Sequence, residues 1–162
     1  MTKKIGYLSG IIAFLISLIS KIPINPSENL EINFRLFVID NTEYYIWGSL
    51  ENGIISFSSM VSQFPENLIA IFIWCLVIFI GISSIIASNS NTKYNSSFKL
   101  YILNILFSAF LLIINSVIIF ILLDWNDFIS IFSIIGMGYY LILIILVINI
   151  ISLHFLKKNE KY

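Results

Sequence analysis

The chain has 162 residues, of which 59% are hydrophobic and 11% are charged, and its formal net charge is zero. Soluble domains have roughly 45–50% apolar and about 25% charged residues, so this composition is typical of a membrane protein. The zero net charge gives no indication of nucleic acid as a partner, and the single cysteine, Cys75, excludes a disulfide within the chain.

Four apolar segments are long enough to be transmembrane helices. A hydrocarbon core about 30 Å thick needs about 20 residues of helix. The segments lie near residues 5–22, 68–87, 100–123 and 128–156, and the last is long enough to tilt or protrude. We therefore predict a single domain over residues 1–162, an all-α membrane four-helix bundle.

The first segment has two interpretations. It follows "MTKK" and so resembles a secretory signal peptide, but no small-x-small cleavage site follows it in "LISKIPINP". It also carries small residues at spacings of four, three, four and three: Gly6, Gly10, Ala13, Ser17 and Ser20. Small residues let helix backbones approach closely in lipid. We predict a retained helix that packs through this stripe.

The loop of residues 23–66 carries a strand pattern. Leu30–Ile39 alternates with a period of two, Asp40–Glu43 is turn-forming, Tyr44–Gly48 is aromatic, and Glu51–Gly53 is a second turn signal. Ile54–Ser62 can supply a third strand. Three strands are about the minimum for a stable sheet, so we predict a small antiparallel sheet here.

The aromatic strand of this sheet holds the candidate interface residues. Because side chains alternate along a strand, Tyr45 and Trp47 should share one face, and Tyr44 and Ile46 the other. We expect Tyr45 and Trp47 to pack on the helices and the other pair to be free for a partner. Tyr and Trp concentrate binding energy at interfaces.

Charge predicts the orientation in the membrane. Most basic residues lie at the termini and in the linker 88–99: Lys3, Lys4, Lys93, Lys99, Lys157, Lys158 and Lys161. The other two loops hold mainly acidic residues: Glu28, Glu31, Asp40, Glu43, Glu51, Glu66, Asp124 and Asp127. Because short cytoplasmic loops collect Lys and Arg, we predict a multi-pass protein of the cell membrane with both termini cytoplasmic and loops 23–66 and 124–127 extracellular.

This arrangement resembles the claudin-like four-helix membrane proteins. They have cytoplasmic termini and a long first extracellular loop folded as a small sheet. "Trp47-Gly48-Ser49-Leu50" is similar to the Gly-Leu-Trp signature of that loop, whereas the two disulfide-bonded cysteines of claudins are absent here. The resemblance implies a claudin-like fold with an extracellular antiparallel sheet in the first outer loop.

The sequence has no recognisable catalytic, cofactor or metal site. No Asp, Glu, Lys or Arg lies within the hydrocarbon part of any predicted helix, although proton relays and ion pathways depend on such residues. The single histidine, His154, has no neighbouring metal ligands in the sequence and is better explained as an interfacial side chain. We expect neither enzymatic activity nor a cofactor.

Polar and small residues recur inside the third and fourth helices. Asn104, Ser108 and Asn115 share one helical face at spacings of four and seven, and Asn149 lies in the fourth helix. Buried amides in lipid usually bond to neighbouring helices, so helix packing is the first explanation and a ligand site the second. Gly136, with Gly138 and Ser133, predicts close packing or a kink.

Two functions remain open from the sequence. In the first, the protein is structural or adhesive, and its extracellular sheet contacts a membrane protein partner or a second copy. In the second, it is an accessory subunit that stabilises a larger membrane enzyme or transporter. The lipid bilayer surrounds the helices in both cases.

Overall fold

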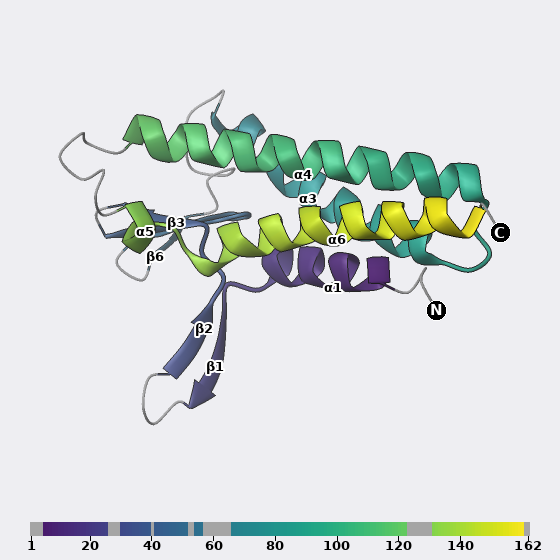
Figure 1. The fold of residues 1–162 in the computed structure, drawn as a ribbon. Coiled ribbons are helices and arrows are strands. Elements are labelled where there is room, and N and C mark those ends of the chain that lie inside the picture. The colour runs from purple at the N-terminus through teal and green to yellow at the C-terminus, as the bar shows by residue number, and fades with distance from the viewer. Residues whose placement is uncertain are drawn as a thin grey trace.

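The computed structural model describes residues 5–25, 30–39, 41–51, 54–56, 66–122 and 131–160. Its main helices lie side by side along a common direction (Figure 1): α1 (Ile5–Leu18), α3 (Glu66–Ser88), α4 (Tyr94–Leu122) and α6 (Met137–Glu160). α1 begins and α6 ends at the same end of the bundle, and the strands lie at the other end (Figure 1).

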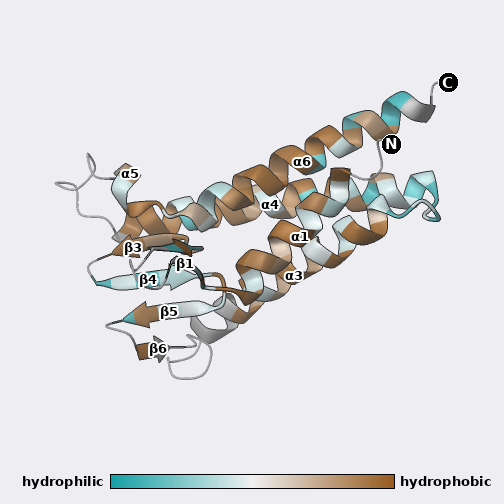
Figure 2. Cartoon of the chain, turned by 90° about the horizontal axis from the view of Figure 1, so that it is seen from below, coloured by the Kyte–Doolittle hydropathy of each residue, from teal (hydrophilic) through white to brown (hydrophobic). Residues whose placement is uncertain are grey.

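Three of these helices are long and apolar enough to cross a membrane. The spans are Ile71–Ser88, Tyr94–Ile121 and Met137–Lys158, and α1 is a shorter apolar helix of 14 residues. Residues coloured brown, for high hydropathy, recur along most of the length of these helices (Figure 2). Apolar side chains on all sides are expected of helices that face both neighbours and lipid. By length and composition, these three helices are candidate spans of a multi-pass membrane protein.

α1 lies against α3 and α6, and α4 packs against both of these longer helices. The centre of the bundle is made of fully buried aliphatic side chains: Ala13, Ile16, Val77, Ile80, Leu111, Ile142 and Ile145. Other large apolar side chains of α4 point outward, among them Leu106, which is 59% exposed, and Ile113, which is 62% exposed. The outward faces are those that lipid or another transmembrane protein would cover.

The strands form two antiparallel sheets between α1 and α3. β1 (Lys21–Asn25) and β2 (Leu30–Asn33) make a two-stranded hairpin that projects sideways from the bundle (Figure 1). The second sheet has four strands in the order β3-β4-β5-β6, with bounds Phe37–Ile39, Thr42–Tyr45, Gly48–Glu51 and Ile54–Ser56. The structure confirms the prediction of packed apolar helices and of antiparallel strands after the first helix.

The structure corrects the predicted strands. The segment Leu30–Ile39 is not one strand, because the chain turns at residues 34–36 and places β2 and β3 in different sheets. Tyr44–Gly48 is not one strand either. Tyr45 pairs with Gly48, so Ile46 and Trp47 form a two-residue hairpin turn. Of the predicted third strand, residues 54–56 form β6, and residues 57–62 lie outside the described part of the chain.

The ends of the helices also differ from the prediction. α1 ends at Leu18 rather than near residue 22, because β1 begins at Lys21. The last apolar segment is not one helix from residue 128. It contains the short helix α5 (Ile131–Ile134), then a β-bridge between Ile135 and Phe37, and only then α6. Residues 124–127 lie outside the described part of the chain.

Candidate functional site

The two sheets and the bundle meet at residues 34–36, which we call the junction. Each backbone N–H of the junction has a partner from a different place. Phe34 N donates to Ser20 O after α1 (2.8 Å), Arg35 N to Asn33 Oδ1 of β2 (3.0 Å), and Leu36 N to Tyr44 O of β4 (2.7 Å). Every backbone N–H group of the junction thus has an acceptor, so the break in the predicted strand has a specific, hydrogen-bonded conformation.

The carbonyl groups of the junction bind the start of α6. Gly136 N donates to Leu36 O and Gly138 N to Arg35 O, both at 2.8 Å. The first N–H groups of a helix have no partner within the helix, so these bonds satisfy the α6 N-terminus. A Cβ on Gly136 would overlap Arg35 O, and a Cβ on Gly138 would overlap Phe34 O. The two glycines therefore allow the strand to cross directly over the helix end.

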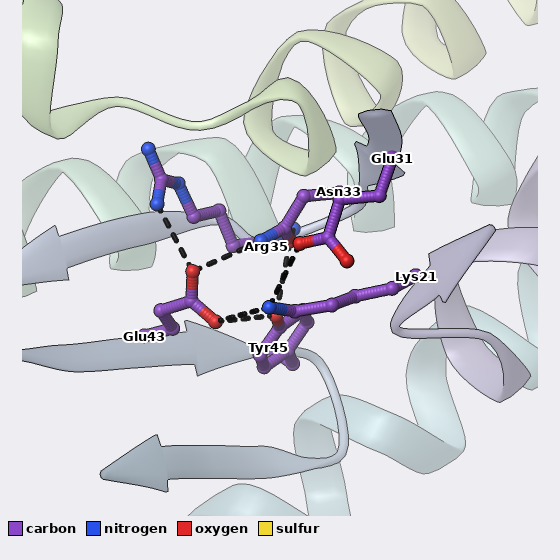
Figure 3. A network of polar contacts seen from close by, with 6 residues as sticks. All are labelled: Lys21, Glu31, Asn33, Arg35, Glu43 and Tyr45. Carbon is purple, nitrogen blue, oxygen red and sulfur yellow. Dashed lines mark hydrogen bonds and ion pairs between the residues drawn. The ribbon is translucent and has the colours of Figure 1, made fainter. Parts of the chain in front are cut away.

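A polar network surrounds Glu43 of β4 and connects the hairpin to the four-stranded sheet (Figure 3). We call it the Glu43 network, and its members are Lys21, Glu31, Asn33, Arg35, Glu43 and Tyr45. Both carboxylate oxygens of Glu43 are occupied. Oε1 accepts from Asn33 Nδ2 (2.9 Å) and Arg35 Nη1 (3.1 Å). Oε2 accepts from Tyr45 OH (2.9 Å) and lies 3.3 Å from Lys21 Nζ.

The network balances its charges internally. Lys21 Nζ is also 3.0 Å from Glu31, so two cations meet two carboxylates. Partial burial opposes the charged form of Glu43, but the Tyr45 hydrogen bond and the Lys21 charge outweigh it and lower the pKa of Glu43. Burial also opposes charge on Lys21, but Glu31 and Glu43 outweigh it and raise the Lys21 pKa. Glu43 and Lys21 therefore stay ionised at neutral pH, and their ion pair helps to hold the hairpin against the four-stranded sheet.

The four aromatic-strand residues predicted for an interface lie next to this network. Tyr45 and Ile46 are buried, at 5% and 2% exposed, while Tyr44 and Trp47 are half-buried. Tyr44 stacks on Phe37 with ring centroids 4.7 Å apart, and Tyr45 stacks on Trp47 at 5.0 Å. The prediction that these four residues alternate between two faces of one strand is wrong, because residues 46 and 47 form the hairpin turn.

A second polar cluster lies inside the bundle where four helices meet. Its residues are Ser9 of α1, Ser83 and Ser84 of α3, Asn104 of α4 and Asn149 of α6, and each is at most 2% exposed. Asn149 Nδ2 donates to Ser9 Oγ (2.8 Å), Asn104 Nδ2 donates to Ser84 Oγ (2.9 Å), and Ser83 donates to Asn104 Oδ1. We call this the amide cluster. Every one of these helices contributes a side chain to it.

The amide pattern of the sequence predicts only Asn104 and Asn149 of this cluster, and not Ser9, Ser83 or Ser84. For Ser83 and Ser84, the signal in the sequence is a pair of serines in the middle of an otherwise apolar run. Of the residues predicted to share a face with Asn104, Asn115 donates to Leu111 O of its own helix (2.8 Å), and Ser108 Oγ has no hydrogen-bond partner among the described residues.

The small residues predicted for packing lie in two places. Gly6, Gly10, Ala13 and Ser17 are buried on one side of α1. A Cβ on Gly10 would approach Ile85 and the carbonyl of Gly81 on α3 to 2.7 and 2.9 Å, which indicates a close α1–α3 contact. Gly136, by contrast, lies before α6 and contacts the junction.

Within the described residues, no cluster of three or more His, Cys, Asp or Glu side chains could hold a metal ion. Cys75 is exposed on α3, and His154 is exposed near the end of α6, with its ring edge-on to Phe155. Comparisons with protein-family models, curated proteins and solved structures found no match to this chain. A function therefore has to be inferred from the chain's own geometry.

Proposed function

We propose that this chain is a structural or adhesion-type membrane protein that uses its sheet end to contact another protein. The observation that supports this most is the attachment of the four-stranded sheet to the bundle. The junction bonds the sheet to α6, and the Glu43 network bonds it to the hairpin. Because both sets of contacts hold the sheet, it should lose little conformational freedom on binding, which favours affinity.

The proposed binding surface is the β6 side of the sheet. β3 is covered at its edge by the bridge to Ile135, whereas β6 pairs with β5 alone among the described strands. Ile54 of β6 is 72% exposed. An exposed edge strand can pair with a strand of another chain, and an apolar side chain on it adds burial. We propose a membrane protein partner or a second copy of this chain at this edge.

The orientation belongs to the same proposal. The short linker 89–93, the start of α1 and the end of α6 share one end of the bundle (Figure 1). With the positive-inside rule, this end is cytoplasmic and the sheets are extracellular. Such an arrangement would be claudin-like in topology, with ionic and backbone contacts in place of the claudin disulfide.

A pull-down with matched variants tests the proposal. The tagged protein would be extracted in mild detergent, and co-purifying proteins and the oligomeric state would be identified by mass spectrometry. We expect Ile54→Lys to lower partner retention at least tenfold without loss of yield. Asn41→Lys, also exposed but in the β3–β4 turn, should retain the partner. The proposal fails if both variants retain it, or if the wild type is monomeric and without a partner.

The accessory-subunit alternative is supported by the outward faces of the long helices. On α4, for example, the exposed side chains Leu106, Phe110, Ile113 and Val117 lie along one stripe. Helices of a larger complex could pack on this stripe. If Leu106→Ala and Ile113→Ala release the partner while Ile54→Lys retains it, the accessory role replaces the sheet-mediated one.

A further inference from the structure

The end of the bundle opposite the sheets carries a group of exposed lysines. Lys93 and Lys99 lie just before and within the first turns of α4, and Lys157 and Lys158 lie in the last turns of α6. α4 and α6 pack against each other, so these residues occupy neighbouring helix ends. In Figure 2 the ribbon at this end includes teal, hydrophilic residues, next to the brown, hydrophobic residues of the helices. We call these four residues the lysine collar.

The collar differs from the cations at the other end of the molecule in how its charge is balanced. Lys21 and Arg35 both form ion pairs with carboxylates. In the part of the chain that the structure describes, no ion pair involves a collar lysine. No Asp or Glu occurs between residues 71 and 121 or between 132 and 158, and Glu160 at the end of α6 is the one acidic residue in the sequences of α4 and α6. The four lysines of the collar therefore exceed the acidic charge that these two helices carry.

The collar lies near the ends of two helices that are longer than a hydrocarbon core is thick. α4 has 29 residues and α6 has 24, which correspond to about 43 and 36 Å of helix. Both exceed a hydrocarbon core of about 30 Å, so their ends reach the headgroup region. Lys157 Nζ lies over the ring of Phe98, 5.3 Å from its centroid, and Phe98 stacks on Tyr94. Aromatic rings and lysine stems of this kind are typical of the membrane–water boundary.

Apolar surface for acyl chains adjoins the collar. Ile102 of α4 and Ile150 and Ile151 of α6 are exposed by 37%, 48% and 40%. A phospholipid has an acidic phosphate above apolar chains, which matches lysines above exposed isoleucines. Zwitterionic lipids carry their own countercharge and would leave the collar unneutralised. We propose that the lysine collar binds the headgroups of anionic phospholipids in the adjacent leaflet.

Lipid retention measured by native mass spectrometry tests this proposal. The protein would be reconstituted in phosphatidylcholine nanodiscs with and without phosphatidylglycerol, and the ratio of the two lipids retained by the protein would be compared with that of the disc. We expect phosphatidylglycerol to be enriched on the wild type. Each lysine replaced by glutamine should lower the enrichment by up to roughly fivefold.

Two variants and a salt series separate binding from folding. The combination Lys93→Gln, Lys99→Gln, Lys157→Gln and Lys158→Gln should lose the enrichment, while the same four positions changed to arginine should keep it. All four side chains are exposed, and the contact of Lys157 with Phe98 that the glutamine variant loses lies at the surface, so both variants should melt close to the wild type in phosphatidylcholine. Enrichment on the wild type should also fall as NaCl is raised.

Three outcomes would overturn the proposal. The first is equal enrichment on the wild type and the glutamine variant, and the second is no enrichment on the wild type. The third is enrichment that is independent of salt. The test does not involve the sheet, so its result is independent of whether the sheet binds a partner.

Discussion

At the residue scale, Gly136 and Gly138 decide how the sheet meets the bundle. Each glycine places its Cα against a carbonyl of residues 34–36, where a side chain has no room. Their N–H groups donate to the same segment. The absence of a side chain thus allows the junction and the start of α6 to share hydrogen bonds directly, so backbone groups attach the sheet to α6.

We expect Gly136→Ala to destabilise the protein by roughly 1–3 kcal/mol, because the added methyl group forces the junction away from α6. Gly81→Ala is the matched control. The atoms nearest to its Cβ would be those of the Phe14 ring, at 3.2–3.4 Å, and a side chain can yield more easily than backbone. Thermal unfolding in detergent measures both variants. Equal shifts in melting temperature would show that the junction is not the constraint.

Glu43 is the other residue on which the sheet end depends. Its pKa is lowered from 4.5, so the stabilisation that it gives is present above that value and is lost as the pH falls through the lowered pKa. The pKa values of Lys21 and Tyr45 are raised, so their contributions are lost only as the pH rises through the alkaline range. Stability of the sheet end should therefore be flat around neutral pH and fall on both sides.

We expect Glu43→Gln to weaken the sheet end by about 1–2 kcal/mol at neutral pH, because charged hydrogen bonds to both oxygens are lost. The variant should also lose the acid dependence that Glu43 causes. Denaturant unfolding followed by near-ultraviolet circular dichroism between about pH 7 and pH 3 measures this. If the variant and the wild type lose stability in parallel over that range, another carboxyl group causes the acid dependence.

At the scale of elements, α1 depends on its neighbours. Its 14 residues give about 21 Å of helix, less than a hydrocarbon core of about 30 Å. Close contact of Gly10 with α3 and the hydrogen bond of Ser9 with Asn149 of α6 hold it in place. Trp74 Nε1 adds a bond of 2.9 Å to Ser17 O at the sheet end. The short helix is thus bonded to two long ones.

Asn149→Ala should loosen α1 and lower the unfolding free energy by roughly 0.6–2 kcal/mol, the range for polar contacts between helices in lipid. Asn115→Ala is the control. Asn115 is equally buried, but its amide donates to Leu111 O within α4, so its loss should leave the contacts between helices intact. Detergent unfolding combined with protease accessibility of α1 measures the difference. An Asn115→Ala variant as unstable as Asn149→Ala would contradict the role of the amide cluster.

At the scale of the whole molecule, charge divides along the bundle axis. The sheet end has its cations paired with carboxylates, and the opposite end has lysines without such partners among the described residues. The chain has no net charge, but its unpaired positive charge among the described residues lies at the end opposite the sheets. By the positive-inside rule, we predict that this end is cytoplasmic.

Cysteine labelling checks the orientation on cells, in a Cys75→Ser background. Asn41 and Ser90 are both exposed and outside helices, at opposite ends of the bundle. We expect Asn41→Cys to react with a membrane-impermeant maleimide on intact cells and Ser90→Cys to react only after lysis. The reverse pattern would place the sheets in the cytoplasm.

The sequence by itself determined that the chain has long apolar helices of membrane-spanning length, and it located α3 closely. It also determined that strands follow the first helix. These features depend on local composition and periodicity, which are visible without knowledge of contacts. The start of α3, at Glu66, and its end, at Ser88, differ little from the predicted 68–87.

Only the tertiary structure decided how these elements join. The alternation of Leu30–Ile39 continues through residues 34–36, but hydrogen bonds to Ser20, Gly136 and Gly138 outweigh the strand preference and turn the chain there. The same contacts hold the chain at Gly136, so α6 begins only at Met137 and not near residue 128. Likewise, Ser9, Ser84 and Asn149 lie far apart in the chain, and their partnership exists only where the helices meet. Hydrogen bonds between distant segments leave no periodic trace in the sequence, which is why local patterns did not reveal them.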